Sequence, residues 1–245
     1  AGNHVVFAVD RAGLVGADGE THQGMFDVPY LLSVPGIKLY SPSSFAELGL
    51  FIKRAIYNEK GPVAVRFPRG GQGEYVLACA DGVSTETLEH GNDVTLVSYG
   101  IMINNVLKAA RLLKEQGQTA EIIKINELSS FDMAGIIDSV KKTGRLIVAE
   151  DCAERGSVGE KICRELMEMG CSAKTKLINL GMEFIPHGNV EQLYEKYGLN
   201  GISLDDLAWP DAREQIICQF DNELSAFCMF CQQHPQQKPL LLIDS

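Results

Sequence analysis

The sequence predicts an α/β protein made of two segments, each built on a parallel β-sheet. Short, continuous apolar runs, typical of strands buried on both faces, alternate along the chain with amphipathic stretches of helical length. Such alternation requires right-handed crossover connections, which join parallel strands. The regular pattern is interrupted between residues 70 and 92, where Gly, Glu and Asp are frequent. We therefore expect a linker at 73–92.

The segment before this linker, residues 1–72, contains three expected strands and one clearly marked helix. A capping box, Ser44 to Glu47, begins the helix, and apolar residues recur along one face of it. A shorter helical stretch is expected near 27–33, and the expected strands are 4–9, 37–40 and 63–67. A parallel sheet needs helices packed on both of its faces. Three strands and one or two helices are too few to form a good hydrophobic core. We therefore expect residues 1–72 to be the C-terminal part of a larger domain.

The segment after the linker, residues 93–220, has the regular alternation of an α/β domain. Glycines at 117, 144 and 170 stand where helix C-caps are expected. The expected strands are 94–98, 121–125, 146–150 and 176–180, and the expected helices are 102–116, 132–143, 158–169, 189–197 and about 211–230. Residues 221–245 are expected to form a C-terminal tail, whose Gln- and Pro-rich end is loosely ordered.

Composition narrows the class of protein. The chain has 245 residues, of which 45% are hydrophobic and 22% charged, and its net charge is -10. An acidic chain repels nucleic-acid phosphates and anionic membranes, so neither is an expected partner. No apolar stretch reaches the roughly 20 residues of a membrane helix, and the first residues lack the pattern of a signal peptide. The seven scattered cysteines are typical of reduced thiols, so we expect a cytoplasmic protein.

Residues 10–27, with the sequence DRAGLVGADGETHQGMFD, concentrate the side chains that can do chemistry. This loop follows an expected buried strand, at the end of the sheet where α/β proteins bind ligands. Its four glycines let the backbone approach a ligand closely, and His22 can exchange protons near neutral pH. On composition alone, a solvated acidic loop with an ordinary surface histidine is an equally good interpretation.

The order of residues in several motifs resembles one known family. DRAG, G-A-D-G-x-T-H-Q-G and F-D within 10–27 resemble the pyrimidine-domain loop of the 1-deoxy-D-xylulose-5-phosphate synthases, which are transketolase-like enzymes dependent on thiamine diphosphate. V-R-F-P-R-G at 65–70 resembles a second family motif, and E-D at 150–151, G-S-V-G at 156–159 and F-I-P-H-G at 184–188 resemble the family's C-terminal domain. The resemblance spans about 4–205. It implies part of a pyrimidine-binding domain followed by a three-layer, transketolase C-terminal-like α/β domain.

The resemblance implies roles for four residues. Arg11 and Arg69 match the arginines that hold the phosphate of glyceraldehyde 3-phosphate, a task suited to bidentate guanidinium groups. His22 matches the active-site histidine near the reacting carbons, and Asp18 matches the acid that contacts substrate hydroxyls. Without the resemblance, Arg69 is an ion-paired turn residue, His22 a hydrogen-bonded loop residue and Asp18 an Asx-turn residue.

The resemblance also implies a reaction. In the family, pyruvate loses CO2 with the help of thiamine diphosphate, and the product of that step adds to glyceraldehyde 3-phosphate. The result is 1-deoxy-D-xylulose 5-phosphate, a precursor in isoprenoid and thiamine biosynthesis. The family also implies a homodimer.

The residues that bind the cofactor in this family have no counterpart in the sequence. The family's G-D-G…N segment, which holds Mg2+ and the diphosphate, does not occur, and neither does its pyrimidine-binding glutamate. We therefore expect the cofactor-binding residues to lie upstream of Ala1, in a missing N-terminal half of the enzyme. The chain alone is expected to bind no cofactor stably and to be inactive.

Two other functions stay open. The chain could be half of a split transketolase or the β-type half of a 2-oxoacid dehydrogenase, although DRAG and the pair Arg11 and Arg69 favour the synthase. It could also be a non-catalytic module whose residues 92–220 serve dimerisation. A metal site at Cys228-x-x-Cys231 with His234 is not expected, because a fourth ligand at the usual spacing is absent.

Overall fold

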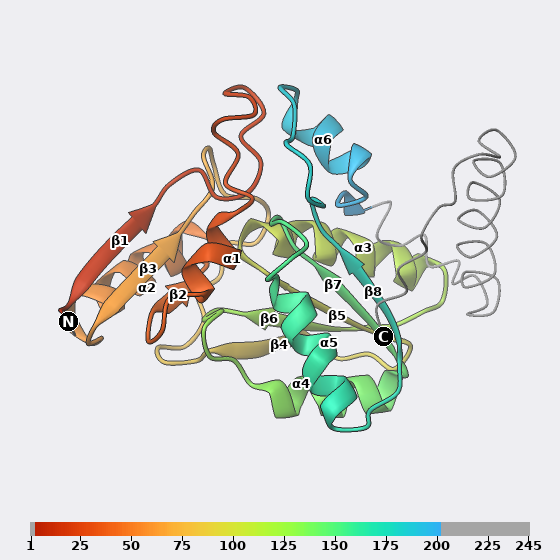
Figure 1. Ribbon diagram of the computed structural model, residues 1–245. Coiled ribbons are helices and arrows are strands. Elements are labelled where there is room, and N and C mark those ends of the chain that lie inside the picture. The colour runs from red at the N-terminus through yellow and green to blue at the C-terminus, as the bar shows by residue number, and fades with distance from the viewer. Residues whose placement is uncertain (1–2, 202–245) are drawn as a thin grey trace, which may run out of the picture. The chain divides into compact units, whose positions relative to one another are not determined.

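The structure is a computed structural model that describes residues 3–201. This part of the chain is organised around two β-sheets (Figure 1). All but one of the strand pairings are parallel, which confirms the predicted α/β class. The helices of these residues are all too short or too polar to cross a membrane. Ala1, the expected helix at 211–230, the expected tail at 221–245 and the Cys228–Cys231 pair lie outside the described residues.

The first sheet has three parallel strands in the order β1-β3-β2. Alternate residues of the central strand β3 point to opposite faces. Ala64 packs in one core with residues of α1, and Val63 and Val65 pack in another with Phe51 and Ala55 of α2. The elements are β1 (Val5–Val9), α1 (Asp27–Leu32), β2 (Lys38–Tyr40), α2 (Phe45–Tyr57) and β3 (Pro62–Arg66). The N-cap half of the expected capping box forms at α2, where the Ser44 side chain accepts a hydrogen bond from the Glu47 backbone N–H, but the Glu47 carboxylate accepts from the Ser43 N–H and not from the Ser44 N–H.

The second sheet has five strands in the order β4-β6-β5-β7-β8. Its central strand β5 is buried along its whole length, because helices cover the sheet. Helices α4 and α5 share one hydrophobic core with β5, β6 and β7, and α3 lies against the sheet on its other side (Figure 1). The strands are β4 (Thr85–Glu89), β5 (Val94–Tyr99), β6 (Ala120–Ile125), β7 (Arg145–Ala149) and β8 (Lys174–Ile178). The helices are η1 (Gly100–Met102), α3 (Ile103–Glu115), α4 (Met133–Thr143), α5 (Val158–Glu168) and α6 (Val190–Lys196).

Strand β4 lies within residues 73–92, for which the sequence pattern predicts no strand. It pairs antiparallel with β6, and the register shifts between Thr87 and Glu89. Its sequence, TETLE, is mostly polar because β4 is a partly exposed edge strand. The apolar run that marks the buried strands is therefore absent from β4.

Candidate active site

The expected substrate loop, residues 10–27, begins where β1 ends. Beside it lies the chain that leaves β3: the Phe67 N–H donates to the Val9 carbonyl, and the Ala12 N–H donates to the Phe67 carbonyl, each at 3.0 Å. Both segments follow the carboxyl ends of neighbouring parallel strands. This edge of a parallel sheet is where α/β proteins place their ligands. Arg11 and Arg69, from the two segments, are thereby brought to one place.

Asp18 lies between the two arginines. Nη1 of Arg11 is 3.0 Å from Asp18 Oδ2, and Nη1 of Arg69 is 2.6 Å from each carboxylate oxygen. The hydrogen bond from Arg69 holds the pKa of Asp18 below its ordinary value, and the positive charges of Arg69, Arg11 and His22 add to the effect. The arginine side chains keep 39% and 53% of their surface exposed. Both guanidinium groups can therefore still meet a ligand from solution.

His22 belongs to the same loop and is exposed. Its Nδ1 lies 2.8 Å from the hydroxyl of Thr21, and its backbone N–H donates to the Gly19 carbonyl. The structure thus brings Arg11, Asp18 and Arg69 into direct contact, and it places His22 within electrostatic reach of Asp18 rather than in a hydrogen bond with it. An exposed imidazole with one anchored nitrogen leaves its other nitrogen open to contact with a ligand.

Arg11 has an unusual backbone. Its φ is +64°, which makes it the one residue other than glycine with a positive φ in the described range 3–201. A side chain in this region costs about 1–3 kcal/mol, and such strain clusters at ligand-binding sites. The Arg11 N–H is held by the Asp10 carboxylate at 2.7 Å. The strained turn is thus fixed by its own neighbour.

A cavity of about 290 Å³ opens beside Arg69. Its wall is formed by Arg69 and Gly70 after β3, by Phe67, and by Ser43 and Phe45 at the start of α2. The hydroxyl of Ser43 is buried there and has no protein partner. A small ligand bound to Arg69 would therefore have room on the α2 side of the site.

The ion pair between Arg69 and Asp18 can be tested by titrating the Asp18 carboxyl group. Replacing Arg69 with alanine is expected to raise the pKa of Asp18 toward its ordinary value, because the largest cause of the lowered pKa is removed. The measurement is the side-chain carboxyl chemical shift by NMR as a function of pH. Asp93 is the matched control, because its lowered pKa comes mainly from hydrogen bonds with Thr119. An Asp18 midpoint that stays where it is in the Arg69→Ala variant contradicts the arrangement.

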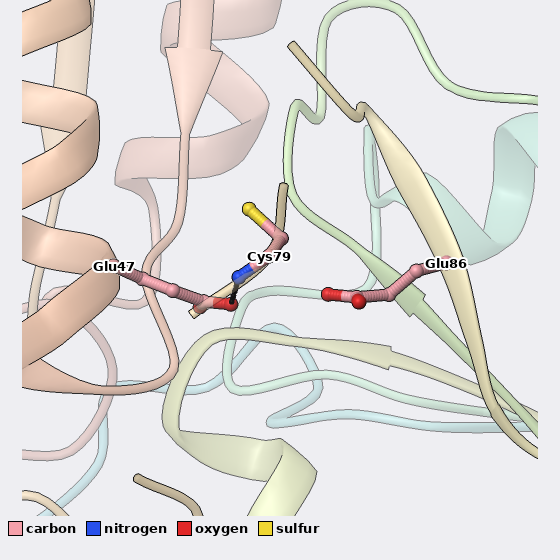
Figure 2. A group of neighbouring side chains, drawn as sticks. All are labelled: Glu47, Cys79 and Glu86. Carbon is pink, nitrogen blue, oxygen red and sulfur yellow. Dashed lines mark hydrogen bonds between the residues drawn. The ribbon is translucent and has the colours of Figure 1, made fainter. Parts of the chain in front are cut away.

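Glu47, Cys79 and Glu86 form the group of neighbouring side chains whose atoms could hold a metal ion among residues 3–201. Figure 2 shows the two carboxylates pointing toward each other, with the Cys79 backbone N–H bound to Glu47. The buried ammonium of Lys124 already lies between them, 2.5 Å from Glu47 and 2.7 Å from Glu86. Burial raises the pKa of the Cys79 thiol to about 11, so it is not a ready thiolate ligand. The cluster is therefore a group of buried ion pairs in which the Lys124 ammonium takes the place of a metal ion.

A second buried ion cluster lies beneath the substrate loop. Arg66 is 1% exposed; its Nε donates to Asp27 Oδ2 at 3.1 Å and its Nη1 to Asp151 Oδ1 at 2.9 Å. Burial raises the pKa of Asp27, the positive charge of Arg66 opposes the rise, and the charge of Asp151 adds to it. Asp27 ends the loop, Arg66 ends β3, and Asp151 follows β7. One buried guanidinium thus joins the loop to both sheets.

Two family models match the chain. The pyrimidine-binding domain of transketolase matches residues 1–72, and the C-terminal domain of transketolase matches residues 84–203. The chain belongs to the transketolase family.

Within the transketolase family, two similar curated proteins are synthases. The chain is 38% identical over 202 residues to the 1-deoxy-D-xylulose-5-phosphate synthase of Halalkalibacterium halodurans, a match that covers 80% of the chain and 32% of the relative. It is 36% identical over 209 residues to the synthase of Heliobacterium modesticaldum, a match that covers 83% of the chain and 32% of the relative. The chain therefore spans about a third of the length of these relatives. The resemblance drawn from the loop motifs is confirmed.

Solved structures agree on the fold. A split-gene transketolase, described as an inactive β4 tetramer, has a TM-score of 0.71 and 26% identity, and the match covers 82% of this chain and 64% of the other. A transketolase from Campylobacter jejuni has a TM-score of 0.64 and 19% identity, and the match covers 82% of this chain and 30% of the other. Together with the family models, these matches confirm a pyrimidine-binding segment followed by a transketolase C-terminal domain.

Motif reasoning on this transketolase-family chain singled out Arg11, Asp18, His22 and Arg69, whose roles stay predictions. It did not single out Arg66 as a partner of Asp27 and Asp151. The available signal was an arginine at the end of the apolar strand PVAVR, because a buried charge requires charged or polar partners. The sequence does not reveal which acids those partners are.

Proposed function

We propose that this chain is the acceptor-binding part of a cytoplasmic 1-deoxy-D-xylulose-5-phosphate synthase, which condenses pyruvate with glyceraldehyde 3-phosphate and releases CO2. The observation that carries the proposal is the convergence of Arg11 and Arg69 on one carboxylate, Asp18, at the ligand-binding edge of the sheet. Two guanidinium groups that share one anion form a site for a phosphate. In the proposal, Asp18 offsets one of the two positive charges until the phosphate of the acceptor arrives.

Arg11, Arg69, Asp18 and His22 have different roles in this proposal. Arg11 and Arg69 bind the phosphate and fix the position of the aldehyde, against a chain whose net charge is -10. When Asp18 is displaced from them, its carboxylate is free to accept hydrogen bonds from substrate hydroxyls. The aldehyde oxygen needs a proton as the new carbon–carbon bond forms, and His22 is the side chain proposed to supply it.

Thiamine diphosphate, when bound, supplies the electron sink for the loss of CO2 from pyruvate. Among the described residues, the one group of neighbouring side chains that could hold its Mg2+, at Glu47, is already filled by Lys124. The sequence also has no G-D-G…N segment. We therefore assign the cofactor to a further polypeptide segment that corresponds to the remaining part of the relatives, about two thirds of their length. That this segment lies upstream of Ala1 stays a prediction.

The first sheet offers a place for such a segment. β1 lies at the outer edge of the order β1-β3-β2, so one side of its backbone has no strand partner in the described part of the chain. Val5 and Phe7 on this strand are 43% and 47% exposed. An exposed apolar edge strand is a template for pairing with another segment. In this proposal the cofactor-binding segment completes the sheet at β1, and the complete enzyme is a homodimer.

Reconstitution tests the proposed function. The chain is mixed with the segment that supplies the remaining two thirds or so of the relatives' length, thiamine diphosphate, Mg2+, pyruvate and glyceraldehyde 3-phosphate, and 1-deoxy-D-xylulose 5-phosphate is measured. We expect product from the mixture and none from either part alone. Product only with a ketose-phosphate donor would identify a transketolase instead. Absence of product with every donor, despite folding and association of the two parts, would identify a non-catalytic module.

The match to a split-gene transketolase favours a second candidate, in which the chain is one of two separately encoded subunits. That structure is described as an inactive tetramer of one kind of subunit. By analogy, the isolated chain would associate with its own copies and be inactive until the other subunit is added. Light scattering before and after the other subunit is added distinguishes self-association of the chain from a complex of two different subunits.

A further inference from the structure

A segment near the end of the described chain, Phe184–Gly188, contacts the substrate loop. We call it the clamp segment. Its Ile185 is fully buried, so the segment is anchored in the body of the protein. At one end, the ring of Phe184 meets the ring of Phe26 edge to face, with 6.0 Å between centroids. The clamp segment therefore touches the loop just before α1 begins.

The other end of the clamp segment contacts the middle of the loop. The Gly188 N–H donates a 3.0 Å hydrogen bond to the Gly16 carbonyl. The two backbones are so close that a Cβ on Gly16 would lie 2.0 Å from the Gly188 carbonyl oxygen. A glycine at position 16 is thus required by the contact itself.

His187 lies against the residue that follows Asp18. Gly19 has a φ of +78°, and a Cβ built there would be 3.7 Å from the Cβ of His187 and 4.0 Å from its Cδ2. The space beside Gly19 is therefore closed on one side by the His187 side chain. Asp18, the next residue back, is the carboxylate that joins Arg11 to Arg69.

We propose that His187 and Gly188 are positioning residues of the acceptor-phosphate site, and that the clamp segment sets the position of Asp18 and Arg11. This inference rests on the proposed function. A loop with four glycines has large conformational freedom, and ordering it before the substrate binds removes an entropic cost from binding. Neither residue needs to touch the substrate, because each acts through the loop.

Hydrogen–deuterium exchange of the 245-residue chain tests the clamp without any enzymatic activity. The variants are His187→Ala, whose side chain is exposed, and Gly16→Ala, which cannot keep the Gly188 contact. Gly49→Ala is the matched control, because a Cβ at this position in α2 meets nothing within 4 Å. We expect exchange of amides 13–24 to rise about tenfold in the first two variants and to stay unchanged in the control, with 94–99 unaffected in all three.

If amides 13–24 of folded His187→Ala exchange at the same rate as in the unchanged chain, the proposed role of the clamp segment is overturned. Because Gly16→Ala can impair folding, the decision rests on His187→Ala, and Gly16→Ala adds support only where 94–99 keeps its protection. Failure of the proposed function leaves these exchange results intact, so the two failures are distinguishable.

Steady-state kinetics of the assembled enzyme tests the consequence for the site. In His187→Ala we expect the KM for glyceraldehyde 3-phosphate to rise about tenfold while kcat changes less than about twofold, and the KM for pyruvate to stay constant. His187→Gln is expected to restore most of the loss, because a side chain of similar reach still packs against Gly19. A fall in kcat that His187→Gln does not restore would assign His187 to the proton chemistry and overturn a positioning role.

Discussion

Replacing Arg66 with methionine is expected to lower the free energy of unfolding by about 3–5 kcal/mol, because it leaves two carboxylates in the interior without their cation. Asp27 and Asp151 both accept hydrogen bonds from Arg66, which is 1% exposed. The loss should appear in urea unfolding at neutral pH. Arg111→Met is the control, since Arg111 pairs with Glu74 at an exposed position and is expected to cost less than about 1 kcal/mol.

The cost of Arg66→Met is expected to shrink at low pH. The pKa of Asp27 is already raised by burial, and Arg66 opposes that rise, so removing Arg66 raises the pKa further. When an acid has a higher pKa in the folded state than in the unfolded state, the folded state binds more protons, and its stability falls as pH rises between the two pKa values. Lowering the pH through this window therefore favours the folded variant. The free energy of unfolding of the variant is compared with that of the unchanged protein at pH values from about 7.5 down to about 5. A difference that grows as the pH is lowered would contradict this prediction.

Most of the fold could be predicted because buried parallel strands have a strong sequence signal. Strands such as β5, with the sequence VTLVSY, coincide with short apolar runs, and helices α2, α4 and α5 have clear N-caps. β4 was not predicted because an edge strand half open to water is polar. The sequence signal follows apolar composition, so the polar strand β4 escapes it, whereas β1 was found through its apolar sequence VVFAV although the expectation that it is buried was wrong.

The candidate site could be predicted in its parts but not in its contacts. The resemblance placed Arg11 and Arg69 together at one phosphate but did not predict their contacts with Asp18, and the salt bridge between Asp18 and Arg69 joins residues 51 positions apart. Long-range pairs of charges depend on how the segments pack, which local sequence does not encode. The Glu47–Lys124 pair shows the same limit, because Glu47 was expected only as a member of a helix capping box.

The last expected result concerns substrate recognition. In the assembled enzyme, Arg69→Ala is expected to lower kcat/KM for glyceraldehyde 3-phosphate roughly 100- to 1,000-fold, because charge-assisted hydrogen bonds to the phosphate are lost. Arg69→Lys should recover only part of this, since an ammonium cannot form the two parallel hydrogen bonds of a guanidinium. Arg164→Ala is the control, because Arg164 is an exposed residue of α5 and should leave the rate unchanged.

The decisive comparison uses glyceraldehyde, which lacks the phosphate. If Arg69 binds the phosphate, Arg69→Ala should lower kcat/KM for glyceraldehyde by less than about threefold, because this aldehyde never makes the lost contact. An equal loss with both aldehydes would show that Arg69 acts instead by holding Asp18 and the loop. The two roles are physically distinct, because the phosphate must displace Asp18 from the guanidinium, whereas a structural pair must stay closed. Comparing the aldehydes therefore tests whether the contact seen between Asp18 and Arg69 is a resting state of the site or a permanent part of it.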